Sequence, residues 1–209
     1  MVVLASRSGV LQRDGAAEWQ LLKASGASTR VQQCDVADAA DDLRLVADST
    51  ALRGLWHAAG VLADSLLLAQ TAASLAQVYA PKVHGAWSLQ GACALACLST
   101  CTLFSSVAGL LGNAGQANYS AANACLDVLS ASRRARAQKA VAVQWGAWAE
   151  VGMAARGVAS ERLAAMEVSS GFGRIGLAQG LTALATALHP HGLAAIAVAH
   201  VVWSRLLGP

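Results

Sequence analysis

The sequence predicts an α/β fold in which a doubly wound parallel sheet carries helices on both faces. The first observation behind this prediction is that short apolar segments suited to strands alternate along the chain with segments of helical periodicity. The second is a central stretch, residues 83–126, that contains no Lys, Arg, Asp or Glu. Interior strands of a parallel sheet are continuously apolar because helices cover both faces. This stretch is therefore expected to be the buried centre of the domain.

The individual elements follow from the local pattern. Apolar runs bounded by turn residues predict strands at 2–5, 29–36, 52–60, 99–106, 140–145 and 194–202. Helical spacing predicts helices at 14–25, 39–49, 74–98, 118–137 and 176–188, with 203–207 as a short tail. Residues 146–174 are long and glycine-bearing, and we interpret them as a lid because such loops are usually functional. The absence of repeats and linkers predicts one domain, 1–209.

The apolar composition raises the question of a membrane segment. Hydrophobic residues make up 56% of the chain and the mean hydropathy is +0.46. However, polar residues such as Gln90, Thr102 and Asn113 interrupt every window of the roughly 20 apolar residues that a spanning helix needs. We therefore expect no membrane span.

Charge and cysteine usage exclude two further classes. The formal net charge of +3 includes one basic cluster after a predicted helix, which we interpret as a solvated helix end rather than a nucleic-acid interface: Arg133, Arg134, Arg136 and Lys139. Five cysteines without paired spacing predict neither a disulfide framework nor a metal site. No signal-peptide pattern is present at the start of the chain. A reducing, cytoplasmic location is expected.

The most specific stretch is 104–129, where a strand ending at Ser106 leads through a glycine-bearing loop into a helix. Tyr119 and Asn123 are four residues apart and therefore share a face of that helix. This arrangement predicts that a hydroxyl and a phenol meet at one active site. Upstream, Pro81 removes a helical hydrogen-bond donor, so a kink there would aim Lys82 toward the same place. The alternative is an ordinary exposed lysine.

Seven motifs, in this order, give the chain a family resemblance: SRSG (6–9), CDV (34–36), HAAGVL (57–62), PKVHGAW (81–87), FSSVAG (104–109), GQANYSAANA (115–124) and WGAW (145–148). With them the chain resembles the ketoreductase domain of polyketide synthases, a branch of the short-chain dehydrogenase/reductase superfamily. The resemblance implies a Rossmann-like sheet. Family members carry a strand and a TGGxGxxG turn just upstream of the SRSG strand, and this sequence begins without them. We therefore expect an N-terminally truncated chain, with its first strand missing, that binds NADPH poorly alone.

The resemblance also implies roles for four residues. Tyr119 is expected to donate a proton, Ser106 to orient the substrate carbonyl, and Lys82 and Asn123 to support them. The superfamily at large has a YxxxK order, in which a lysine would stand at Asn123. In this branch the lysine lies on the helix before the serine strand, which matches Lys82.

The cofactor implied by the resemblance is NADPH. Arg7, beside Ser6, is the expected partner of the 2′-phosphate, since a guanidinium binds phosphate oxygens in a fixed fork. Asp35 and Val36 resemble the adenine contact. The small residues under the ribose and nicotinamide would be Ala58, Ala59 and Gly60.

Fewer positions bear on the substrate contacts and on the configuration of the product. An LDD-like motif occurs as Leu62, Ala63 and Asp64, and Leu111 stands where a tryptophan goes with the other hydroxyl configuration. This combination favours a D-configured product. Met153, in the lid, is a further candidate substrate contact.

The expected function is NADPH-dependent reduction of a β-ketoacyl thioester on an acyl carrier protein, with neighbouring synthase domains as further partners and without nucleic acid. Two alternatives remain open. One is a catalytically silent scaffold with the ketoreductase fold. The other is a free-standing reductase of another carbonyl substrate.

Overall fold

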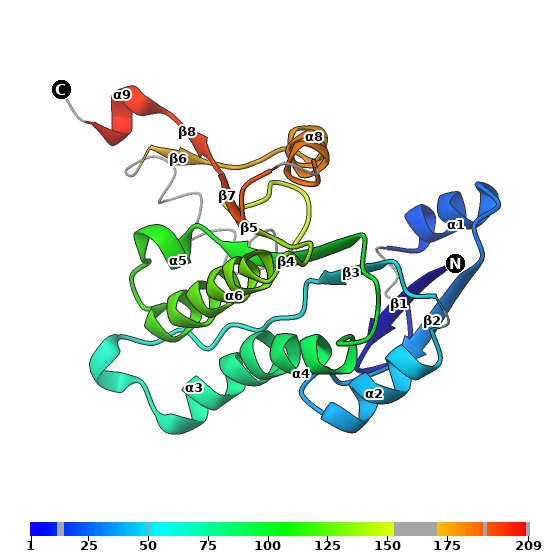
Figure 1. Cartoon of the computed structure of the whole chain (residues 1–209). Helices are drawn as coiled ribbons and strands as arrows, with labels where there is room; N and C mark the ends of the chain where they lie inside the picture. The colour runs from blue at the N-terminus through cyan, green and yellow to red at the C-terminus, as the bar shows by residue number, and fades with distance from the viewer. Residues whose placement is uncertain (12–14, 50, 153–170, 190–191, 208–209) are drawn as a thin grey trace. The chain divides into compact units, whose positions relative to one another are not determined.

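The structure of the chain, a computed structural model, describes residues 1–11, 15–49, 51–152, 171–189 and 192–207 (Figure 1). Contacts divide the chain into two compact units. The first unit comprises Met1–Leu52 and His84–Ala96, and the second comprises Arg53–Val83 and Cys97–Pro209. Both contain parallel strands joined by helical crossovers, which confirms the α/β prediction.

The first unit is built on a parallel strand pair. Strand β1 (Val2–Ser6) pairs with β2 (Thr29–Gln33), with Val2 opposite Thr29. Its helices are α1 (Ala16–Ala24), α2 (Ala39–Ala47) and α4 (Gly85–Ala92). Helix α2 begins where the Asp38 carboxylate accepts a hydrogen bond from the Ala40 N–H. Helix α4 approaches the end of β2 so closely that a Cβ atom at Gly85 would lie 2.7 Å from the Val36 carbonyl oxygen.

The second unit contains a four-stranded parallel sheet in the order β3-β4-β5-β7. These strands are β3 (Gly54–His57), β4 (Thr100–Ser106), β5 (Val141–Trp145) and β7 (Ala195–Val198). Among the described strands, β1 pairs only with β2, and β3 only with β4. Within the described residues, one edge of β1 and one edge of β3 therefore have no ladder partner.

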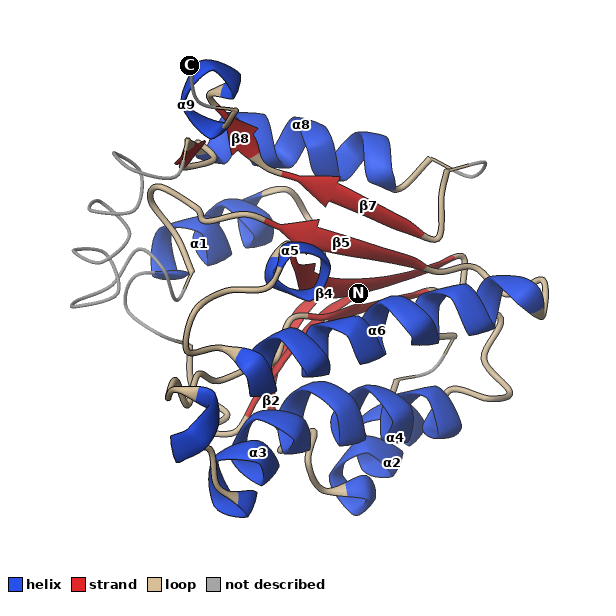
Figure 2. Cartoon of the chain, turned by 90° about the vertical axis from the view of Figure 1, so that its left-hand side faces the viewer, coloured by secondary structure: helices blue, strands red, loops and turns tan. Residues whose placement is uncertain are grey.

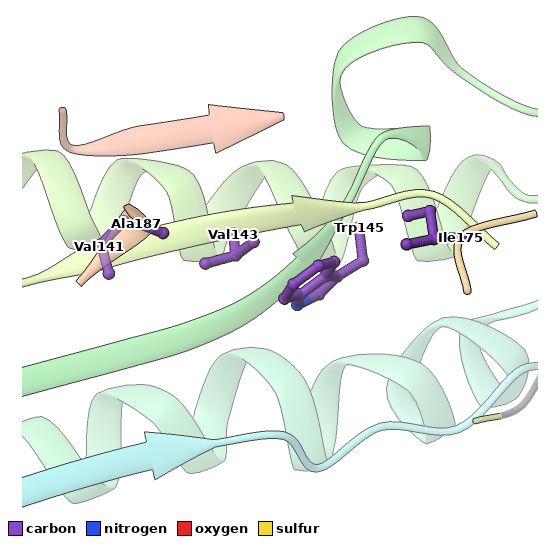
Figure 3. Packing of buried hydrophobic residues seen from close by; sticks show 5 residues of the cluster. All are labelled: Val141, Val143, Trp145, Ile175 and Ala187. Carbon is purple, nitrogen blue, oxygen red and sulfur yellow. The ribbon is translucent and has the colours of Figure 1, made fainter. Parts of the chain in front are cut away.

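Helices of the second unit cover both faces of its sheet. Because side chains alternate along a strand, Val141, Val143 and Trp145 of β5 point to one face, where they pack with Ile175 and Ala187 (Figure 3). Ala187 belongs to α8 (Leu177–Ala187). On the other face, α6 (Ala117–Ala135) runs along β4 and β5 (Figure 2).

The remaining elements of this unit are short. They are η2 (Leu67–Ala69), α3 (Ala72–Tyr79), α5 (Ala108–Leu111), β6 (Phe172–Gly173), β8 (His200–Val201) and α9 (Trp203–Leu206). Strands β6 and β8 pair in antiparallel fashion. None of the helices in the described part of the chain is long and apolar enough to cross a membrane.

Several predicted elements differ from the structure. The helix expected at 74–98 ends at Ala92 and is interrupted by a π-helical turn, η3 (Ala80–His84). The strand expected at 194–202 is divided at Ala199 into β7 and β8, and the predicted tail forms α9. Strands β2 and β3 are shorter than the apolar runs that predicted them. Most of the proposed lid, residues 153–170 with Met153, lies outside the described residues.

Candidate active site

Lys82 enters the site from the π-helical turn η3. Pro81 has no N–H group to donate to the helical ladder, and the chain here adopts the wider π turn, a feature common at functional sites. Lys82 is buried, with 3% of its surface exposed, and its Nζ atom donates a hydrogen bond of 3.0 Å to the Phe104 carbonyl oxygen. The exposed-lysine alternative is therefore wrong, and the helix is interrupted at Pro81, where the sequence predicts a break.

The surroundings of Lys82 oppose its charge. Burial lowers the pKa of Lys82 to about 8, and the Asp127 carboxylate raises it in part. The His57 side chain, 3% exposed, lies at the end of β3 beside the Pro81 and Lys82 backbone, and burial lowers its pKa to about 4. His57 therefore stays neutral near pH 7. A Cβ atom at Gly60 would lie 2.9 Å from Lys82 Cε, so a glycine there leaves the room that the lysine occupies.

Tyr119 lies in the first turn of α6, with 9% of its surface exposed. Lys82 Nζ is 5.2 Å from the centre of the Tyr119 ring, close enough for cation–π attraction. Burial raises the pKa of Tyr119, while hydrogen bonding from the Asn123 and Ser106 side chains lowers it in part. An ammonium and two polar side chains thus surround the phenol.

Ser106 is the last residue of β4, directly before the turn into α5. Its Oγ atom accepts a hydrogen bond of 3.2 Å from the Ala108 N–H, which anchors the hydroxyl oxygen at the end of the strand. The carboxyl ends of parallel strands are the usual location of ligand sites in α/β proteins. Strand β4 and helix α6 thus bring Ser106 and Tyr119 together, as predicted.

Asn123 follows Tyr119 by one helical turn and is fully buried. Its Nδ2 atom donates to the Tyr119 carbonyl oxygen at 2.8 Å, and its own carbonyl oxygen accepts from Ser105 Oγ at 3.3 Å. The first bond lies within α6, and the second joins α6 to β4. Asn123 Oδ1 is buried and has no hydrogen-bond partner among the described residues. An unpaired buried acceptor of this kind is available to a donor that enters the site.

The segment after β3 forms the side of the site that carries the candidate stereochemical residues. Leu62 packs against the buried cluster that includes Tyr119. Asp64 accepts two hydrogen bonds from Gln116 Nε2, at 3.1 and 3.2 Å, and is exposed. Leu111, at the end of α5, is 60% exposed.

Sequence reasoning missed several supporting residues. Asn118 donates to the Ala63 carbonyl oxygen at 2.9 Å and to the Ser74 carbonyl oxygen at 3.3 Å, so it ties the 62–64 segment to α6 and α3. Asp127 follows Tyr119 and Asn123 at the same four-residue spacing, which the sequence shows. His57 opens the HAAGVL motif, yet its burial could not be inferred from the motif alone.

Comparison with known proteins identifies the family. The KR domain family matches residues 1–150, most of the chain. The chain belongs to the KR domain family.

Relatives of this KR domain are segments of large synthases. Polyketide synthase GfsB of Streptomyces halstedii is 39% identical over 210 residues, which cover 98% of this chain and 4% of the synthase. Mycoketide-CoA synthase of Mycobacterium tuberculosis (strain ATCC 25618 / H37Rv) is 39% identical over 163 residues, or 76% of this chain and 4% of that protein. The chain therefore spans only a few per cent of these relatives.

Solved ketoreductases share the fold of this KR domain. An A-type ketoreductase from a modular polyketide synthase matches with a TM-score of 0.88 and 33% identity over 98% of this chain and 43% of that chain. PlmKR1, from the first module of phoslactomycin biosynthesis in Streptomyces sp. HK803, gives 0.87 and 34% over 98% of this chain and 47% of that chain. The Rossmann-like fold expected from the sequence is thus confirmed.

The candidate phosphate contact of the KR domain lies in its first unit. Ser6 ends β1, and the Arg7 side chain that follows is exposed. Among the described residues the Arg7 guanidinium forms no ion pair. An exposed guanidinium without an acidic partner fits a phosphate group.

The other candidate cofactor residues follow β2 and β3. In the first unit, Asp35 Oδ1 accepts from the Ala37 N–H at 3.0 Å, which fixes the turn that contains Val36. In the second unit, Ala58, Ala59 and Gly60 follow β3 and present only small side chains, which fits the close approach of a flat ring.

Proposed function

We propose that this KR domain reduces a β-ketoacyl thioester, carried on an acyl carrier protein, to the β-hydroxyacyl thioester, with NADPH as reductant, within a polyketide synthase. The observation that carries the proposal is the buried Lys82 ammonium 5.2 Å from the Tyr119 ring, with Ser106 and Asn123 beside the phenol. This set of groups suits proton delivery to a developing alkoxide.

Tyr119 is the proton donor in the proposed reaction. Reduction of a ketone carbon leaves negative charge on the carbonyl oxygen, and the phenol O–H transfers its proton to that oxygen as the charge forms. Burial alone makes the phenol a weaker acid, because it raises the pKa. The Lys82 ammonium counters this effect, since a nearby positive charge favours the phenolate that remains. Lys82 must therefore be charged for efficient turnover.

Ser106 orients the substrate. Its hydroxyl, anchored at the end of β4, donates a hydrogen bond to the same carbonyl oxygen, and such preorganised donors usually contribute most to the stabilisation of developing charge. Asn123 supports the phenol through its position one turn along α6. The four side chains thus divide proton transfer, charge stabilisation and positioning among them.

NADPH would supply the hydride. We assign its 2′-phosphate to Arg7 beside Ser6, its adenine to Asp35 and Val36, and its ribose and nicotinamide to Ala58, Ala59 and Gly60. The exposed guanidinium of Arg7, which forms no ion pair within the described ranges, supports the choice of NADPH over NADH.

The acyl chain would lie against the segment after β3. Leu62 and Asp64 border Tyr119 from that side, and we propose that they favour the D-configured product. We further propose that 1–209 acts as one ketoreductase domain beside other synthase domains.

The matched pair of tyrosines tests this proposal, since the sequence contains only Tyr79 and Tyr119. In the full-length protein, Tyr119→Phe should lower the turnover of a β-ketoacyl thioester surrogate by about 100-fold or more, the range lost with a general acid. Tyr79→Phe, which removes a hydroxyl from α3 near Cys125, should leave turnover within about two-fold. Near-wild-type turnover of Tyr119→Phe would refute the assignment.

A further inference from the structure

Asp127 lies on the face of α6 that carries the catalytic candidates. Tyr119, Asn123 and Asp127 are spaced four residues apart, so their side chains follow one another along one side of the helix. The two earlier residues belong to the site described above. Asp127 is a further polar residue in the same row, one turn deeper along the helix, and the proposed function gives it no role.

A hydrogen bond holds the Asp127 carboxylate in place, but only one of its two oxygens has a hydrogen-bond donor among the described residues. Asp127 Oδ2 accepts a hydrogen bond of 2.7 Å from Gln144 Nε2 on β5. Asp127 Oδ1 is buried and has no hydrogen-bond partner among the described residues. A carboxylate in this situation gains from a positive charge nearby, because its second oxygen has lost water without gaining a donor.

The register of the sheet places the hydrogen-bond partners of Asp127 and Lys82 on adjacent strands. Gln144, which anchors Asp127, lies opposite Ser105 on β4. The residue before Ser105 is Phe104, whose carbonyl oxygen accepts the hydrogen bond from Lys82 Nζ at 3.0 Å. Lys82 and Asp127 are thus tied to neighbouring positions of adjacent strands.

The other titratable groups near Asp127 and Lys82 either have hydrogen-bond partners of their own or are neutral near pH 7. On α6, Arg133 and Arg134 lie more than one turn beyond Asp127 and donate to the Lys139 and Ala140 carbonyl oxygens. On β3, His57 faces the lysine and remains neutral near pH 7.

Two titratable groups remain near the phenol, and neither compensates the lysine charge. Tyr119, on α6, is un-ionised near pH 7 because burial raises its pKa. Asp64, in the segment after β3, acts on Tyr119 and accepts two hydrogen bonds from Gln116. Asp127 is therefore the acid that acts on Lys82 within the described residues.

We propose that Asp127 is a positioning residue whose carboxylate, anchored by Gln144, keeps Lys82 in its ammonium form next to Tyr119. This inference rests on the proposed function, because only a charged lysine assists proton transfer from the phenol. Asp127 contacts neither substrate nor cofactor and acts through Lys82. Burial removes hydration that stabilises the ammonium, and the carboxylate restores part of that stabilisation through space.

Direct titration of Lys82 tests the proposal without reliance on activity. The sequence contains three lysines, Lys23, Lys82 and Lys139, so NMR of lysine side chains labelled with ¹³C can resolve each one in the full chain. In the unaltered protein Lys82 should titrate near pH 8. Asp127→Asn keeps an acceptor for Gln144 but removes the charge, and should lower the Lys82 midpoint by about one pH unit.

Two control variants separate the effect of charge from that of packing. Asp127→Glu retains the carboxylate and should keep the Lys82 midpoint within a few tenths of a pH unit of the unaltered protein. Gln144→Met removes the anchoring hydrogen bond but leaves the charge, so the midpoint should move less than in Asp127→Asn. Should Asp127→Asn fail to fold, the carboxyl ¹³C signal of Asp127 in the unaltered chain should still show an inflection at the Lys82 midpoint.

The proposal is overturned if a folded Asp127→Asn protein keeps the wild-type Lys82 midpoint, or if the Asp127 carboxyl signal shows no inflection there. The pH profile of turnover gives an independent readout, because the alkaline fall of kcat should move to lower pH with the lysine midpoint. A uniform loss of kcat at every pH would indicate a structural role instead. Failure of the proposed function would show as full activity of Tyr119→Phe, which leaves the NMR result intact.

Discussion

At the scale of single residues, the main energetic feature of the site is the cost of burying the charge of Lys82. The Lys82 residue is only 3% exposed, so its ammonium group loses most of its hydration, and the hydrogen bond to the Phe104 carbonyl oxygen replaces only part of it. The neighbouring Asp127 offsets a further part. The chain therefore keeps a lysine where an apolar side chain would be more favourable for folding, as expected if the charge serves catalysis.

Replacement of this lysine should separate stability from activity. The folded-state pKa of Lys82, about 8, lies below its ordinary value of 10.5, so the unfolded chain binds more protons between these two pH values. Wild-type stability should consequently rise as the pH increases from about 8 to 10.5. Lys82→Met should be more stable than wild type at pH 7 by about 1–2 kcal/mol, with the unpaired Asp127 limiting the gain, and should lack this pH dependence.

Urea unfolding at pH 7 and pH 10 measures both the stability of Lys82→Met relative to wild type and the pH dependence of each protein. Lys23→Met, which changes an exposed lysine on α1, is the control and should retain the wild-type pH dependence. We expect Lys82→Met to have lost most of its reductase activity despite its greater stability. A Lys82→Met protein that is less stable than wild type at pH 7 would contradict the burial argument.

At the scale of elements, the turn η3 and helix α6 build the site together. Helix α6 supplies Tyr119 and Asn123 from one face, and η3 inserts Lys82 beside them. The sequence predicts α6 and the break at Pro81, because helical spacing and a missing N–H group are local properties. It does not predict that the break is a π turn or that Lys82 is buried. Those features depend on contacts with β3 and β4, which lie far away in the sequence.

Lys82 also contacts Gly60, in the turn after β3, and a substitution of this glycine tests how tightly the turn constrains the lysine. Gly60→Ala would place a methyl group 2.9 Å from Lys82 Cε, so the buried ammonium must move away from its present position. Since small misplacements of catalytic groups cost up to about 100-fold in rate, we expect turnover to fall by roughly ten-fold or more while the protein remains folded.

Gly91→Ala is the matched control for this change. Gly91 lies in α4, and a Cβ atom there would have no neighbour within 4 Å. This substitution should leave turnover unchanged and raise the free energy of unfolding by about 0.5–1 kcal/mol, because alanine favours a helix more than glycine does. Steady-state kinetics and thermal unfolding distinguish the two variants. Equal turnover of Gly60→Ala and wild type would show that the lysine position is not constrained by this turn.

At the scale of the whole molecule, the order of the motifs identified the family, whereas periodicity identified only the fold class. Alternating strand and helix patterns were sufficient for the α/β class, and the motif order was sufficient for the KR domain family. They could not give the division of the described strands into separate sheets, β1-β2, β3-β4-β5-β7 and β6-β8. Nor could they reveal what Asp127 and His57 do, although the spacing of Asp127 and the motif that His57 opens are visible in the sequence. Both act through burial and through-space charge, which single positions in a sequence do not display.

The most direct test of the account is the mass of a β-ketoacyl thioester, bound to an acyl carrier protein, after incubation with the full-length protein and NADPH. We predict that the acyl group gains two hydrogen atoms, one on the β-carbon and one on its oxygen, and that Tyr119→Phe largely abolishes this gain. An unchanged acyl mass in the presence of folded wild-type protein with bound NADPH would contradict the proposed function.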